Sequence, residues 1–169
     1  MDIGSDAAGL GSAGIRAHKK PRDIHSYGLK LLKKNGFIKG QSIDITYAKG
    51  EIRLFTMDAA KKQFYFDPSP VNIPFARLIF QIYSVDKITG ASIYEREKVT
   101  EEKTKTGNNV VRLRSLGVQI TMDDATLPVL HIQCLPFTAV GNSEYMSRLA
   151  VAQRIMTLLG DALGQKSEV

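Results

Sequence analysis

The strongest constraint on the fold is the two-residue alternation of apolar and polar side chains that begins near residue 42. Apolar residues occupy every second position from Ile43 to Tyr47, with polar residues between them. This period places successive side chains on opposite faces of a β-strand. We therefore expect about seven antiparallel strands joined by short turns, over residues 42–47, 52–57, 63–66, 75–85, 91–99, 110–122 and 128–135.

Three of these segments depart from simple alternation. Residues 75–85 are almost continuously apolar, and their β-branched and aromatic content favours a strand over a short buried helix. Residues 101–109 are polar and are predicted to form a hairpin tip. The alternation changes phase at Ser115–Gly117, which predicts a bulge or bend inside the long strand.

Two segments have the period of a helix instead. The first is short, starts at a cap formed by Asp23, and ends at Asn35-Gly36, a pair suited to the left-handed turn that stops a helix. The second begins at Asn142 and is expected to stop at Gly164. Its apolar stripe recurs at spacings of four and three through Tyr145, Leu149, Ala152, Met156, Leu159 and Leu163.

The fold class predicted from this order is α+β, mainly β. We expect a bent antiparallel sheet or partly open barrel of about seven strands, closed by the C-terminal amphipathic helix and preceded by a short N-terminal helix. Residues 1–22 are expected to be a flexible basic tail, residues 23–165 a single domain, and residues 166–169 a frayed end.

The order of elements resembles the pleckstrin-homology-like superfold, and bacterial and phage PH-like domains of unknown function in particular. The segments that carry this resemblance are Tyr27–Leu29, Lys39–Gln41, Val111–Met122, Leu127–Ile132 and the helix around Tyr145–Leu159. The resemblance covers roughly residues 27–163. It implies a binding or scaffolding role rather than catalysis, and it assigns no functional residues.

The chemistry-bearing residues do not form an enzyme motif. Gly9–Gly14 spells G-x-G-x-x-G, but no strand precedes it, so it does not predict a nucleotide site. His131 and Cys134 are three residues apart on a predicted strand and therefore lie on opposite faces. The paired carboxylates at 101–102 and 123–124 lie in predicted turns. The sequence predicts no catalytic residue, no cofactor and no metal site.

The positive charge is concentrated at one end of the chain. The net charge is +6, and residues 1–49 hold nine basic and four acidic side chains, a net of +5. The candidate anion-binding or partner-binding residues are Arg16, Lys19, Lys20, Arg22, Lys30, Lys33, Lys34 and Lys39. Such a cluster can neutralise the phosphates of nucleic acid or of an anionic membrane, although a solvated tail and helix face would look the same.

A second group of positive charges is expected on a hairpin of the later strands. There Arg112 and Arg114 would lie opposite Arg96 and Lys98. Glutamates at 95, 97, 101 and 102 are interspersed with them and are expected to neutralise most of this charge across the strands.

The leading functional hypothesis is a non-catalytic module that recognises a protein partner, with a phage or mobile-element protein that acts on a host complex as one variant. The contact surfaces considered are an open sheet edge, a groove beside the C-terminal helix and the basic segment. Alternatives are nucleic-acid or anionic-membrane binding through the basic segment, and an enzyme with an unrecognised site. No run of 18 apolar residues and no signal sequence is present, so we expect a cytoplasmic protein.

Overall fold

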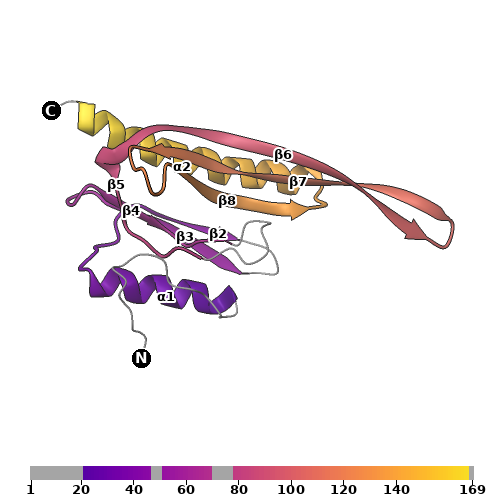
Figure 1. The fold of residues 1–169 in the computed structure, drawn as a ribbon, viewed down its shortest axis with the longest axis horizontal. Coiled ribbons are helices and arrows are strands. Elements are labelled where there is room, and N and C mark those ends of the chain that lie inside the picture. Colours follow the sequence, from indigo (N-terminus) through magenta and orange to yellow (C-terminus); the bar gives the residue numbers. More distant parts are fainter. Residues whose placement is uncertain (1–20, 47–50, 70–77, 168–169) are drawn as a thin grey trace. The chain divides into compact units, whose positions relative to one another are not determined.

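The computed structural model describes residues 21–46, 51–69 and 78–167, and it confirms an α+β fold that is mainly sheet. The strands form two antiparallel sheets, one in the order β2-β3-β4-β5 and one in the order β6-β7-β8 (Figure 1). Neither sheet closes into a barrel within the described residues. A short helix opens this part of the chain and a long helix ends it, as predicted.

The chain folds into two compact units, and the division falls between Lys87 and Ile88. The first unit contains α1 (Pro21–Lys34), β2 (Ser42–Thr46), β3 (Ile52–Asp58), β4 (Gln63–Phe66), β5 (Tyr83–Ser84) and a single 3₁₀ turn (Val85–Lys87). The second contains β6 (Ile88–Thr104), β7 (Gly107–Met122), β8 (Val129–Thr138) and α2 (Asn142–Ser167).

Helix α1 begins two residues earlier than predicted and ends where predicted. Pro21 occupies its first position, where a missing N–H costs nothing, so Asp23 lies inside the helix instead of capping it. Gly36 has φ of +64°, and the Phe37 N–H donates to the Leu32 carbonyl at 2.9 Å. This is the left-handed stop expected from Asn35-Gly36.

The prediction of a strand over residues 75–85 is wrong for its described part. Residues 78–82 have no regular secondary structure, and only Tyr83–Ser84 pairs with β4. The large side chains cover the first unit instead: the Phe80 ring lies 5.6 Å from that of Tyr27, and Tyr83 stacks on Phe64 at 5.3 Å. Apolar content here reflects burial by an irregular segment, which the strand and helix periods do not describe.

The hairpin tip predicted over residues 101–109 is present, but it is much shorter than predicted. Strands β6 and β7 pair without interruption up to Thr104 and Gly107, so the loop is only Lys105 and Thr106. Strand β6 likewise starts at Ile88, three residues before the predicted start at residue 91, with an irregularity between Ile88 and Gly90. The strand residues within 101–109 are polar on both faces because the strands have no core to cover, and a polar run of this kind has the sequence pattern of a loop.

The bulge predicted in the long strand is not found in β7 itself, which pairs with β6 without a register shift from Gly107 to Thr121. The pairing of β7 with β8 shifts register between Arg114 and Leu116 and again between Leu116 and Gly117. Ser115 is buried there, and its hydroxyl donates to the Leu135 carbonyl at 3.0 Å. The extra residues at both shifts belong to β8, and α2 packs on the same sheet.

Helix α2 starts at Asn142 as predicted but does not stop at Gly164. Tyr145, Ala152 and Leu159 from the predicted stripe are buried, together with Ile155. A glycine ends a helix when it takes the left-handed conformation. The described glycines with positive φ are Gly36 and Gly107, so Gly164 stays helical and the helix runs on to Ser167.

Candidate functional site

The most distinctive feature of the second unit is a two-stranded ribbon, which we define as residues 98–104 of β6 and 107–113 of β7. The last residue of β8 pairs with Arg114, so the ribbon lies beyond the third strand of its sheet (Figure 1). Seven residues per strand correspond to about 24 Å at about 3.4 Å per residue. Almost every ribbon side chain is exposed, so the ribbon is a surface and not a part of the core.

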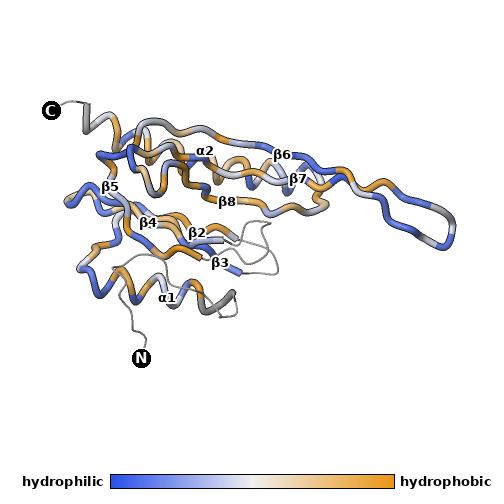
Figure 2. The backbone as a smooth tube through the Cα atoms, viewed as in Figure 1, coloured by the Kyte–Doolittle hydropathy of each residue, from blue (hydrophilic) through white to orange (hydrophobic). Residues whose placement is uncertain are grey.

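The ribbon carries two exposed valines among charged side chains, an arrangement visible as short apolar stretches within a polar arm in Figure 2. Val99 is 57% exposed and Val110 is 63% exposed. Val99 pairs with Arg112, and Val110 pairs with Glu101, which is two residues after Val99 on β6. Residues two apart on a strand, and residues paired across strands, share a face, so the two valines lie on the same face of the ribbon. Val99 and Val110 are therefore diagonal neighbours and give this face of the ribbon one small exposed apolar patch.

The charges on this hairpin are arranged differently from the prediction. We expected Arg112 and Arg114 opposite Arg96 and Lys98, but the register places Arg114 opposite Glu97 and Lys98 opposite Leu113. The Arg112 guanidinium lies 3.2 Å from the Glu97 carboxylate, which confirms that a glutamate neutralises an arginine across the strands.

The base of the ribbon is held by the start of α2. The Tyr145 hydroxyl donates to the Glu95 carboxylate, and the Arg114 guanidinium lies 3.6 Å from the centre of the Tyr145 ring. Arg148 donates to the Cys134 carbonyl on β8 at 3.0 Å. Charge-assisted and cation–π contacts of this kind fix the direction in which the ribbon leaves the sheet.

The opposite face of the same base carries aromatic rings. The Tyr94 and His131 rings meet edge to face at 5.3 Å, and Arg96 lies 5.0 Å from the Tyr94 ring. Lys98 lies 5.7 Å from the ring of Phe137. Burial, and secondarily the charge of Arg96, lower the pKa of His131, so its ring is neutral near pH 7 and shares a hydrogen bond with Gln119.

The predicted basic cluster is only partly within the described residues. Arg16, Lys19 and Lys20 lie outside them, and Arg22 belongs to α1 but its side chain is not described. Lys30, Lys33 and Lys34 are exposed on α1 at spacings of three and four, so they share one helix face. Lys39 is exposed in the segment that follows.

Lys61, which the sequence did not single out, joins the end of this helix. Its ammonium donates to the Gly36 carbonyl at 2.6 Å and lies 3.5 Å from the Asn35 carbonyl. It thus binds the negative end of the helix dipole from the β3–β4 turn. Nothing in the sequence separates it from any other turn lysine, because the contact spans 25 residues.

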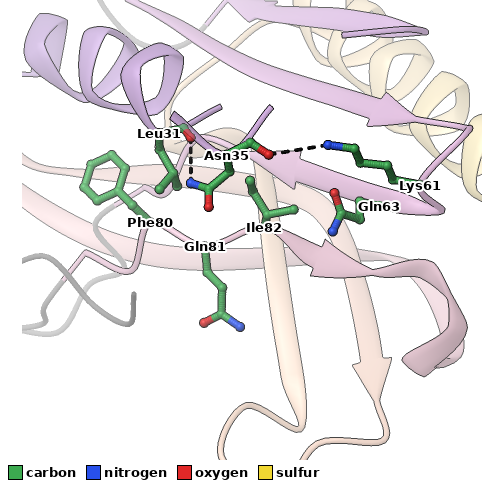
Figure 3. A pocket seen from close by; sticks show the side chains of 7 residues that line it. All are labelled: Leu31, Asn35, Lys61, Gln63, Phe80, Gln81 and Ile82. Atoms are coloured by element: carbon green, nitrogen blue, oxygen red, sulfur yellow. Dashed lines mark hydrogen bonds between the residues drawn. The ribbon is translucent and has the colours of Figure 1, made fainter. Parts of the chain in front are cut away.

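A cavity of about 310 Å³ lies beside this lysine in the first unit. Figure 3 shows its lining: Leu31, Asn35, Lys61, Gln63, Phe80, Gln81 and Ile82. Lys61 is the one ionisable side chain among these seven, and its ammonium already donates to the Gly36 carbonyl. The amides of the lining can hold a small polar group by hydrogen bonds.

A buried polar group anchors α1 on the sheet of the first unit. Asp67 is 3% exposed and accepts hydrogen bonds from the Tyr65 hydroxyl at 2.7 Å and the Leu54 N–H at 2.8 Å. His25 Nδ1 lies 3.0 Å from the same carboxylate. This carboxylate is thus largely used for structure, and Gly28 leaves no room above it.

The other reactive side chains that the sequence points to within the described residues do not form a reactive or metal-binding site. Cys134 is fully buried, and burial raises the pKa of its thiol to about 12, which leaves it protonated and unreactive. Within residues 21–46, 51–69 and 78–167, no three acidic, histidine or cysteine side chains gather as metal ligands would. The helices of the same residues are all too short or too polar to cross a bilayer.

Comparisons of the chain with protein families, with curated proteins and with solved structures found no match.

Proposed function

We propose that the chain is a non-catalytic binding or scaffolding module that recognises a protein partner through the ribbon. The observation that supports this is the exposed ribbon itself, with Val99 and Val110 on one face. Anchoring of its base by Tyr145 and Arg114 presents that face with little ordering cost on binding. A phage or mobile-element protein that acts on a host complex would be one instance of such a module.

The PH-like arrangement is part of the same proposal. An antiparallel sheet followed by a C-terminal helix that packs across it supports the arrangement, as does the order of the elements. In such folds, binding to exposed strands is a usual way to capture a partner. The cytoplasmic location and the absence of catalysis remain predictions of the sequence.

Site-specific crosslinking tests the role of the ribbon. A photoreactive phenylalanine placed at Val99 or Val110 of the full chain should form a covalent adduct with a partner in the cells that produce it. Met146 on α2, which is 58% exposed, provides the matched control position. Adducts at the ribbon but not at Met146 support the proposal, and equal yields at all three positions would refute it.

A second candidate, binding of nucleic acid or an anionic membrane, is favoured by the shared face of Lys30, Lys33 and Lys34. Binding to duplex DNA weakens as salt rises, so log K falls with log salt; changing all three to Gln should make this slope less steep by about 0.9 per lost phosphate contact. Changing Lys87, Lys103 and Lys105 to Gln alters the net charge by the same amount and should leave a steeper slope than in the first triple variant. Equal slopes for the two triple variants would reject this candidate.

A further inference from the structure

The outer edge of β6 is open over the ribbon. Within the described chain β6 pairs with β7 alone, and the side chains of residues 95–99 and 101–104 are exposed. An open edge of this length presents backbone N–H and C=O groups that can pair with another strand. Native proteins usually prevent such pairing with charged edge residues, so the pattern of charges decides whether pairing is blocked or directed.

The loop length fixes which backbone groups face outward. Thr104 and Gly107 flank a two-residue loop, so this pair can only be a hydrogen-bonded one. Hydrogen-bonded and non-hydrogen-bonded pairs alternate from there along the ribbon. Even-numbered residues of β6 therefore bond to β7, and the odd-numbered residues Val99, Glu101 and Lys103 direct their N–H and C=O to the open edge.

This alternation limits how two copies of β6 can pair. When two antiparallel β6 strands are related by a twofold axis, odd-numbered residues of one copy must face odd-numbered residues of the other. The axis must then lie at a facing pair of identical residues, and not midway between two such pairs. An axis at Lys98, Glu101 or Glu102 places that charge against its own copy, and an axis at Val99 places Glu97 against Glu101. Each of these registers sets like charges directly opposite one another, which is destabilising.

An axis at Thr100 gives the opposite result. Lys98 then faces Glu102 of the second copy, and Glu97 faces Lys103. By symmetry each of these pairs occurs twice, and no like charges meet. The pairing ends at Arg96 opposite Thr104, the last residue of β6, which carries no charge.

We infer that the β6 edge binds a second copy of this chain, antiparallel and centred on Thr100, to form a symmetric dimer with a continuous six-stranded sheet. This inference rests on the proposed function, because it names the partner of the ribbon. Lys98 and Glu97 each already have a contact within one copy, and neither contact prevents this pairing. Lys98 lies 5.7 Å from the centre of the Phe137 ring, and Glu97 uses one carboxylate oxygen for Arg112, which leaves the other oxygen for Lys103 of the second copy.

A charge exchange tests the register. Lys98→Glu and Glu102→Lys each create two like-charged contacts per dimer and should weaken dimerisation roughly tenfold or more, as measured by sedimentation velocity at low salt. Mixing the two variants restores both pairs, so a heterodimer should form between partners that do not self-associate. Arg154→Glu and Asp161→Lys on α2 serve as matched charge-reversal controls.

A disulfide provides a second, independent measurement. Residues facing each other at a non-hydrogen-bonded position have Cα atoms about 4.5 Å apart, which suits a disulfide. Thr100→Cys should therefore form a covalent dimer when oxidised glutathione accepts the two electrons, while Asn109→Cys on β7 should not. Cys134 is buried and does not compete.

The outcomes separate the two proposals. A monomer at up to about 1 mM, or a dimer unaffected by both charge reversals and not linked by Thr100→Cys, overturns the inference. If the ribbon crosslinks in cells to a different protein while the purified chain stays monomeric, the proposed function stands and the dimer is excluded. If neither crosslinking nor dimerisation involves the ribbon, both proposals fail.

Discussion

Substitution of Gly28 should reveal how tightly α1 packs against its sheet. A Cβ atom at this position would lie 2.2 Å from the Tyr65 hydroxyl oxygen and 2.4 Å from Asp67 Oδ1. An ordinary carbon–oxygen contact is about 3.3 Å, so the helix or the two side chains must move by about 1 Å. Gly28→Ala therefore forces apart the buried polar group that anchors the helix.

The two contributions to the free energy of unfolding have opposite signs. Replacing a glycine inside a helix by alanine ordinarily stabilises it by about 1 kcal/mol. Overpacking costs about 1–3 kcal/mol, and a weakened hydrogen bond between Tyr65 and Asp67 adds about 1 kcal/mol or more. We expect Gly28→Ala to lower the free energy of unfolding by about 2 kcal/mol, which is about 1 M in the urea midpoint.

The matched control is Gly160, which lies inside α2 and where an added Cβ would meet no heavy atom within 4 Å. Gly160→Ala should stabilise the chain by up to about 1 kcal/mol. Circular dichroism in urea measures both variants, and Tyr65→Phe should reduce the cost of Gly28→Ala because it removes the nearest atom. An increase in the urea midpoint for Gly28→Ala would refute the reasoning.

Three further predictions concern titratable groups and the ribbon base. The Ile38 N–H, 2.9 Å from the Asp58 carboxylate, lowers the pKa of Asp58 below 3.8. A carboxyl whose pKa is lowered on folding stabilises the fold at pH values above its ordinary pKa, and this contribution is lost as the pH falls. The difference in free energy of unfolding between wild type and Asp58→Asn should therefore shrink as the pH falls below about 3.8. Cys134 should not react with a thiol reagent at pH 8 until urea unfolds the chain, and rapid reaction of the native protein would contradict its burial. Tyr145→Phe should raise amide exchange in the ribbon base, whereas the exposed Met146→Ala should not; equal exchange would show that Glu95 does not anchor α2.

The sequence predicts those parts of the fold that depend on local patterns. Alternation locates β2, and the Asn35-Gly36 pair locates the end of α1, because neighbouring residues determine both. The phase slip at Ser115–Gly117 lies where the pairing of β7 with β8 shifts register, but the extra residues belong to β8 and not to the long strand. The boundaries of the long strands cannot be predicted this way, because polar residues of the ribbon pair with each other instead of facing a core.

The candidate site is less predictable than the fold. The sequence draws attention to lysines of the N-terminal segment, since their clustering is visible in one dimension. The contact of Lys61 with Gly36 and the position of Gly28 above Asp67 depend on residues far apart in the chain. The register that sets Glu97 opposite Arg114 differs by one residue from the expected one, and a one-residue difference changes every facing pair.

The two-residue loop of the ribbon also restricts how its length can change during evolution. Removing Thr104 and Gly107 would leave Lys103 and Asn108 beside the loop. That pair is a non-hydrogen-bonded one, and it cannot close a two-residue loop. Homologous chains that keep this loop should therefore differ in the ribbon by multiples of four residues, and each step would change its reach by about 7 Å.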